Sequence, residues 1–313
     1  MATMKKGLLL FFLFSTRLVQ AQPVKELISH GQQLLGEKKY IEALDVYNKA
    51  FKRDSTKYDV FTGRGTAYFE MKEYQKCYDD FSRAIALEPD SALAYHYRAN
   101  LMYVLNYTDE AIADNTKAIE RTTNEKFLLG CFINRGSARE QKRDYKGAYE
   151  DFYRAYSYDT TDISVLNNLG TVLDDLGRRD EAILFLKKAI ALDSSFVGPY
   201  VNIGFQYTLM GRYEEALVYF SKALQLEKDE PLTLNNRGFA RYKLNDLEGA
   251  LEDINRSILL YNTNSFAYKN RALVYLAMDK KEEACKDLEH AKELQFEKQY
   301  GPEVNELIKK NCQ

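Results

Sequence analysis

Small residues recur along the chain at intervals of 34 positions, and this period limits the possible folds more than any other feature. Seven steps separate eight small residues, six of 34 residues and one of 37, so three residues are inserted near positions 126–128. A fixed period of this length is typical of solenoids built from stacked helical hairpins. The eight positions are Gly31, Gly65, Ala99, Gly136, Gly170, Gly204, Gly238 and Ala272.

Three further columns keep the same phase. Two hold small residues and begin at Ala43 and Ala50. Small residues let two helices approach closely, and bulky ones fill the space between them. Neither helix of a repeat can bury its apolar face alone, so the core must form where neighbouring repeats stack. The third column is bulky except for its one asparagine: Tyr47, Phe81, Asn115, Phe152, Leu186, Phe220, Ile254 and Leu288.

The segment 201–229, VNIGFQYTLMGRYEEALVYFSKALQLEKD, carries a pattern that resembles the tetratricopeptide repeat. About eight units with this register cover an array over residues 22–298. The resemblance implies an all-α fold, a right-handed superhelical α-α solenoid whose concave groove is lined by the first helix of each repeat. After the array, Pro302 suits the first turn of a helix, and residues 299–313 predict a C-terminal capping helix.

The first 21 residues differ from the rest. Lys5 and Lys6 precede an apolar run over 7–14, and small residues lead to a cleavage site after Ala21. A helix needs about 20 apolar residues to span a bilayer, and this run is too short. We therefore expect a signal peptide over 1–21 and a periplasmic or secreted protein without an integral membrane span. An uncleaved N-terminal anchor is the alternative.

Catalytic chemistry is not indicated by the motifs. The three histidines, His30, His96 and His290, fall in different repeats without metal-ligand spacing, and no phosphate-binding glycine loop occurs. A formal net charge of −2 gives no reason to expect nucleic-acid binding. We expect no enzyme, no cofactor and no metal site, and a catalytic site in the groove remains the alternative.

Arginine and aspartate recur together in five repeats. The arginine stands just before the first-column residue, and the aspartate just before the bulky-column residue of the same repeat. We predict ion pairs that tie the two helices together and set their register. The alternative is an inherited pattern with both side chains solvated. The pairs are Arg64–Asp80, Arg98–Asp114, Arg135–Asp151, Arg237–Asp253 and Arg271–Asp287.

Four cysteines in an exported chain invite a disulfide. Cys77 stands in a small-residue core column, so we expect it to be buried and free, and Cys131 lies far along the array from the others. If the last repeat's second helix and the capping helix are antiparallel about a turn near residue 298, Cys285 and Cys312 occupy mirror positions. We predict a Cys285–Cys312 bridge, with two unpaired thiols as the alternative.

An asparagine row provides the candidate binding site. Five successive repeats place it at one groove-facing position: Asn134, Asn168, Asn202, Asn236 and Asn270. Such a row can hydrogen-bond the backbone of an extended chain, and it resembles the asparagine ladder of the O-linked N-acetylglucosamine transferase repeats. The alternative is that these side chains bond between neighbouring helices as scaffold.

Three aromatic residues, Phe205, Phe239 and Tyr242, should face the same groove and add apolar contacts. With the asparagine row they favour an exported scaffold or adaptor that binds a protein or extended peptide partner. The second hypothesis is a structural spacer in an envelope assembly, which would bind through its convex face or its ends.

Overall fold

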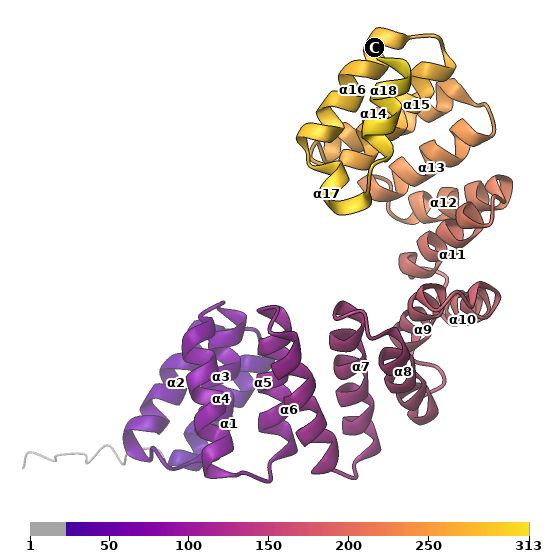
Figure 1. Ribbon diagram of the computed structural model, residues 1–313. Coiled ribbons are helices and arrows are strands. Elements are labelled where there is room, and N and C mark those ends of the chain that lie inside the picture. Colours follow the sequence, from indigo (N-terminus) through magenta and orange to yellow (C-terminus); the bar gives the residue numbers. More distant parts are fainter. Residues whose placement is uncertain (1–22, 313) are drawn as a thin grey trace, which may run out of the picture. The chain divides into compact units, whose positions relative to one another are not determined.

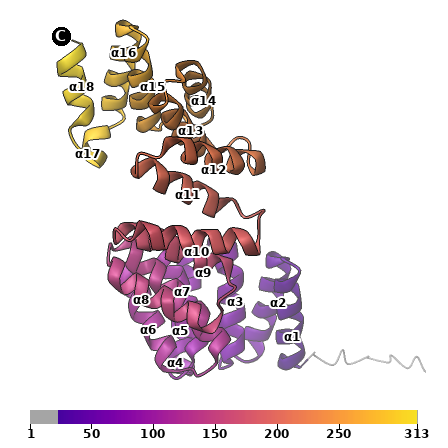
Figure 2. The ribbon, with the colours of Figure 1, turned by 90° about the vertical axis from the view of Figure 1, so that its right-hand side faces the viewer.

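The predicted all-α solenoid is confirmed. The computed structural model describes residues 23–312, and within this range the chain forms helices and turns and no β-strand. Helices α1 to α4, and likewise α6 to α18, pack side by side with the helices that follow them in sequence, as Figures 1 and 2 show. The predicted signal peptide, residues 1–21, lies outside the described residues.

The chain divides into two compact units, and the division between Leu101 and Met102 falls inside α5. In the first unit Tyr47 and Leu27 belong to one apolar cluster, and the Phe81 ring stacks on Tyr97 at 5.4 Å. The helices are α1 (Val24–Gly36), α2 (Tyr40–Arg53), α3 (Tyr58–Glu70), α4 (Tyr74–Leu87) and α5 (Ala92–Val104).

The second unit continues the same pattern of helical hairpins. Its first helices, α7, α9, α11, α13 and α15, each pack on the second helix that follows. The helices are α6 (Thr108–Glu120), α7 (Glu125–Gln141), α8 (Tyr145–Tyr158), α9 (Ile163–Asp175), α10 (Arg179–Leu192), α11 (Val197–Leu209), α12 (Tyr213–Leu226), α13 (Pro231–Lys243), α14 (Leu247–Leu260), α15 (Ser265–Ala277), α16 (Lys281–Glu293), α17 (Phe296–Tyr300) and α18 (Glu303–Asn311).

The small column packs against the bulky column of the same repeat. A Cβ atom added at Gly136 would lie 2.7 Å from the Phe152 ring, and one added at Gly204 would lie 2.7 Å from the Phe220 ring. Such approaches are closer than van der Waals contact, so the two helices require glycine there. The longer step of 37 residues is taken up in α7, which has 17 residues where α9 has 13.

The turn inside each hairpin uses one residue with a left-handed backbone. It comes seven positions after the first-column residue, and its φ lies between 59° and 74° in all eight repeats. Glycine takes this conformation without steric cost, and other residues pay strain. Two of the eight are glycine, and the full set is Lys38, Lys72, Asn106, Arg143, Gly177, Gly211, Asn245 and Asp279.

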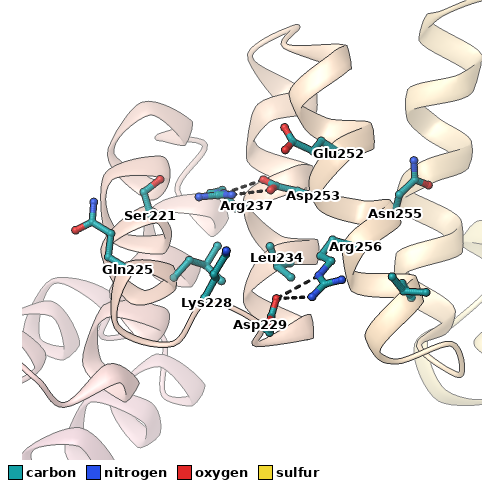
Figure 3. A pocket seen from close by; sticks show the side chains of 12 residues that line it. Ser221, Gln225, Lys228, Asp229, Leu234, Arg237, Glu252, Asp253, Asn255 and Arg256 are labelled. Carbon is teal, nitrogen blue, oxygen red and sulfur yellow. Dashed lines mark hydrogen bonds and ion pairs between the residues drawn. The ribbon is translucent and has the colours of Figure 1, made fainter.

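The structure brings together four of the five predicted Arg–Asp pairs, with shortest N–O distances of 2.6 to 2.7 Å. Figure 3 shows one of them, in which Arg237 on α13 donates two hydrogen bonds to Asp253 on α14. Arg98 and Asp114 belong to different compact units, and their pairing stays a prediction. The four are Arg64–Asp80, Arg135–Asp151, Arg237–Asp253 and Arg271–Asp287.

Two of these aspartates accept from a second arginine that the sequence analysis did not identify. Arg139 lies 2.9 Å from Asp151, and Arg241 lies 3.0 Å from Asp253. Each second arginine stands four residues after the first, on the same face of its helix. Each also donates to a backbone carbonyl in the first turn of the following helix. The i,i+4 spacing was the signal that could have revealed them.

The last repeat is covered by α18, which packs on α16 (Figure 2). Its residues Val304, Leu307 and Ile308 join the apolar cluster that contains Leu288. The short helix α17 precedes it and places Phe296 in the same cluster.

The cysteines take two forms. Cys285 on α16 and Cys312 after α18 form a disulfide, with Cα atoms 5.7 Å apart. Cys77 and Cys131 are free and buried. Burial raises the pKa of each of these two thiols to about 12.

Candidate functional site

A cavity of about 820 Å³ lies in the second unit, on the face formed by the first helices of its last repeats. Residues of α11, α13 and α15 line it, together with Tyr300 at the end of α17. We call it the first-helix cavity. Its apolar wall includes several large side chains that are partly or largely exposed: Phe205, Leu209, Leu232, Phe239, Phe266 and Tyr300.

The structure gathers some of the predicted groove residues here and leaves others outside. Asn236, Asn270, Phe205 and Phe239 line the cavity. Tyr242 does not line it but contacts Phe239, with ring centroids 6.1 Å apart. The remaining predicted asparagines lie elsewhere on the first helices α7, α9 and α11, half-buried: Asn134, Asn168 and Asn202.

Two asparagines of the row form hydrogen bonds that join neighbouring first helices. Asn202 donates to the side-chain oxygen of Asn167 at 3.0 Å, and also to Thr171 at 3.4 Å. Asn270 donates to Asn235 at 3.0 Å, and both residues are buried. This is the arrangement that the scaffold interpretation predicts. Asn202 and Asn270 thus each spend N–H groups on neighbouring helices, and a ladder that holds the backbone of a partner stays a prediction.

Lys269 is a residue of the cavity that the sequence analysis missed. Its exposed fraction is 6%, which is unusual for lysine. Its ammonium lies 3.3 Å from both carboxylate oxygens of Glu303 and within 5.1 to 5.8 Å of the ring centroids of Phe239, Phe266 and Phe296. Burial lowers the pKa of Lys269, and Glu303 opposes that shift.

The position of Lys269 in the repeat was the available signal. It stands three residues before the first-column residue Ala272, where two earlier repeats carry Asn167 and Asn235. Those two asparagines accept the bonds described above, so the position faces the neighbouring repeat. Polar side chains at this position therefore lie between first helices, and in the last repeat the polar group is a cation.

Two side-chain atoms of residues that line the cavity lack a hydrogen-bond partner among the described residues. They are the Asn270 oxygen Oδ1 and the Asn264 nitrogen Nδ2, and both atoms are buried. A buried polar group without a partner costs about 1–3 kcal/mol. Such atoms in a cavity wall mark places where a ligand can supply the missing bond.

A second hollow, of about 700 Å³, lies between the second helices α12 and α14, beside α13 (Figure 3). Two of its arginines are paired with carboxylates, Arg237 with Asp253 and Arg256 with Asp229. Leu224, one of three leucines in its wall, is largely buried. This hollow therefore offers fewer exposed apolar groups than the first-helix cavity.

Over residues 23–312, no group of three or more acidic, histidine or cysteine side chains is placed to hold a metal ion. Among the helices of that same range, none combines the length and the apolar character that crossing a membrane requires.

Comparison with known families gives one consistent result. Models of the tetratricopeptide repeat match residues 58–91, 163–196, 199–230 and 267–298. Human tetratricopeptide repeat protein 13 is 28% identical over 172 residues, which are 53% of this chain and 20% of that protein. The Hsp70/Hsp90 co-chaperone CNS1 of Saccharomyces cerevisiae is 25% identical over 99 residues, 30% of this chain and 26% of that protein. The chain thus matches only a fifth to a quarter of these relatives' lengths.

Solved structures agree on the fold. A tetratricopeptide repeat protein from Parabacteroides merdae superposes with a TM-score of 0.65 at 17% identity, covering 82% of this chain and 99% of that one. The Cut9–Hcn1 hetero-tetramer of APC/C gives a TM-score of 0.68 at 19% identity, covering 92% of this chain and 55% of that one. At these identities the likeness concerns the fold alone.

Proposed function

The chain is a tetratricopeptide-repeat protein, and from this premise we propose that it is an exported scaffold that binds a protein or extended peptide partner along its first-helix face. The first-helix cavity carries the proposal. It combines exposed aromatic and aliphatic side chains with amide groups, which is the composition of a peptide-binding surface. Relatives that are named as co-chaperones are consistent with a protein partner.

The apolar wall is the source of affinity in this proposal. Phe205 is 43% exposed on α11, and Leu232 on α13 and Tyr300 on α17 are similarly open. Large apolar side chains that share one hollow lose water contact together when a partner covers them. Truncating an aromatic anchor of this kind typically costs about 2 kcal/mol of binding free energy.

Export is the second part of the proposal. It is supported by the basic and apolar composition of residues 1–21 and by the Cys285–Cys312 bridge, because disulfides persist in oxidising compartments. N-terminal sequencing of the protein isolated from its native cells tests it. A first residue at Gln22 supports export with cleavage, and a retained Met1 contradicts it.

Binding is tested by affinity capture with the mature protein and three variants. Phe205→Ser and Phe239→Ser alter the first-helix cavity. Leu184→Ser is the matched control, since Leu184 is 68% exposed on the second helix α10 and lies outside the cavity. We expect the captured partner to be lost with both Phe variants and kept with Leu184→Ser, while all proteins melt alike.

The alternative is a structural spacer that binds through its second helices. Exposed Leu259 on α14, in the wall of the hollow of Figure 3, is the observation that favours it. Leu259→Ser would then abolish capture and the two Phe variants would not. That result would overturn the first-helix proposal.

A further inference from the structure

The first-helix cavity has one charged group in its wall. Lys269 is the only Lys, Arg, Asp or Glu among the lining residues, all of which belong to the described part of the chain. Its acidic partner, Glu303, is 53% exposed at the side chain and accepts hydrogen bonds of 3.3 Å, which are long for charge-assisted hydrogen bonds. An ammonium that is taken out of water and only loosely paired favours a second anion.

Apart from Glu303, the surroundings of Lys269 are apolar rings and a second lysine. Lys243 on α13 is close enough to disfavour the charge on Lys269. The Lys243 ammonium lies 5.2 Å from the Phe239 ring centroid. A carboxylate placed in the cavity would therefore meet the Lys269 ammonium with Lys243 nearby, and it would share Lys269 with Glu303, which is not among the lining residues.

The unpartnered Asn264 nitrogen is a second, independent observation. Asn264 caps α15, five residues before Lys269, and its oxygen already accepts from the backbone of Phe266. Its amide nitrogen therefore needs an acceptor, and an oxygen of a ligand can supply it. The unpartnered Asn270 oxygen needs a donor, such as a peptide N–H.

We propose that the first-helix cavity selects a peptide segment in which a large apolar side chain stands near an internal Asp or Glu. This deepens the proposed function and rests on it. The apolar side chain packs among Phe205, Phe239 and Tyr300, and the carboxylate pairs with Lys269. Recognition is therefore selective for side chains, in contrast to a ladder that holds any backbone.

The carboxylate is assigned to a side chain inside the segment because the cavity does not end at Lys269. Its wall includes Leu209 on α11, two first helices before α15, and Tyr300 on α17, which follows the last repeat. A chain can pass the ammonium and keep apolar contact on both sides. A terminal carboxylate would leave one of these walls uncovered.

The test uses nonapeptides that are acetylated at the N-terminus and amidated at the C-terminus. Each carries one Phe and one Asp, one to three residues apart in a Gly-Ser background, and binding to the mature protein is measured by NMR titration of peptide resonances. For the best spacing we expect Asp→Asn in the peptide to weaken binding about tenfold, as loss of a charge-assisted bond does. Phe→Ala should weaken it at least as much.

The variant Lys269→Met tests whether the peptide carboxylate pairs with Lys269, because methionine keeps the apolar stem and removes the charge. In this variant the Asp and Asn peptides should bind within about twofold of each other. Lys286→Met, an exposed lysine on α16 outside the cavity wall, is the matched control and should keep the tenfold difference. Thermal melting checks that each variant is folded.

Three outcomes overturn the inference. The wild-type protein does not distinguish Asp from Asn; Lys269→Met keeps the distinction; or binding requires a free C-terminal carboxylate in an otherwise identical peptide. None of these alters the capture experiment with the Phe205 and Phe239 variants. The general groove proposal can therefore stand while this assignment fails.

Discussion

Asn270 on α15 donates a 3.0 Å hydrogen bond to the side-chain oxygen of Asn235 on α13, with both residues buried. The bond joins two neighbouring repeats, and it uses a side chain that a partner-binding ladder would need. Asn236, one residue further along α13, lines the same cavity and is only half-buried. The two asparagines should therefore respond differently to truncation.

We expect Asn270→Ala to lower the free energy of unfolding by about 1–3 kcal/mol, since it leaves the Asn235 oxygen buried without a donor. Asn236→Ala removes only a longer, 3.4 Å acceptor of the Asn235 amide, so it should lower the free energy of unfolding by less than Asn270→Ala does. Urea denaturation of both variants measures this. Equal stability of the two would mean that the Asn270–Asn235 bond contributes nothing to the scaffold.

Asp253 and Asp151, which each pair with two arginines, should be the most sensitive of the ion-pair aspartates, and Asp253 is the one to test. It accepts from Arg237 and Arg241, and its side chain is 3% exposed. Asp253→Ala leaves Arg237 without its carboxylate and removes one of the two carboxylates near Arg241, and it should cost about 3–5 kcal/mol. Asp287→Ala, which leaves only Arg271, should cost less. Asp229→Ala breaks an exposed pair with Arg256 and serves as the control, at about 0–1 kcal/mol.

We predict that substitutions at the left-handed turn residues change the stability of the folded protein in opposite directions. Lys72→Gly relieves strain at φ 60° and should raise stability by roughly 1 kcal/mol, whereas Gly211→Ala should lower it by a similar amount. Both turns have a left-handed backbone at the substituted residue, with φ 60° at Lys72 and 73° at Gly211. The two substitutions are opposite in direction, so each serves as the control for the other. Thermal melts that move in the same direction for both variants would contradict the strain argument.

We predict that the free energy of unfolding depends on pH because of Glu140 on α7. Burial, with a contribution from Asp175, raises its pKa from 4.5 to about 7. The folded state then holds a proton that the unfolded state releases, so stability should fall as pH rises from about 4.5 to 7 and level off above that. Allowing for solvent screening, the loss should be roughly 1–2 kcal/mol.

Glu140→Gln is the variant that checks this assignment. It should flatten the fall in melting temperature between pH 5 and 7.5, because glutamine does not titrate. If the wild type and Glu140→Gln have parallel profiles, another group is responsible. Asp175→Asn, which removes the neighbouring charge, should reduce the fall only in part.

The disulfide should hold the C-terminal cap in place. Alkylation of the denatured protein should modify two cysteines without reduction and four after it. The double variant Cys285→Ala, Cys312→Ala should lose about 3 kcal/mol, as expected for a loop with a sequence separation of 27. Four alkylated cysteines before reduction would show that the bridge is absent.

The helices and their core could be predicted because close packing restricts which residue sizes fit at each position of the repeat. Gly204 must be small where Phe220 is large, and the same demand repeats at each period. At Gly177 and Gly211 the residue type itself indicates a left-handed backbone. At Lys72 the residue type gives no such signal, because stacking of the repeat overrides the local preference there.

The candidate site was less predictable, since it depends on contacts between repeats. The bond from Asn202 to Asn167 joins residues 35 positions apart, and a column of identical asparagines does not reveal which of them have such a partner. The burial of Lys269 depends in part on α17, a five-residue helix outside the period that begins after left-handed Gln295. No repeat pattern extends to that segment.

The buried thiols of Cys77 and Cys131 bear on how the chain would mature in the oxidising compartment that the proposed export implies. With a pKa of about 12, roughly one thiol in 100,000 is a thiolate at pH 7, and thiolate is the species that attacks a disulfide. Once the repeats have stacked, these thiols cannot exchange with the Cys285–Cys312 bridge. Mispairing through Cys77 or Cys131 is thus confined to chains in which these two thiols are not yet buried.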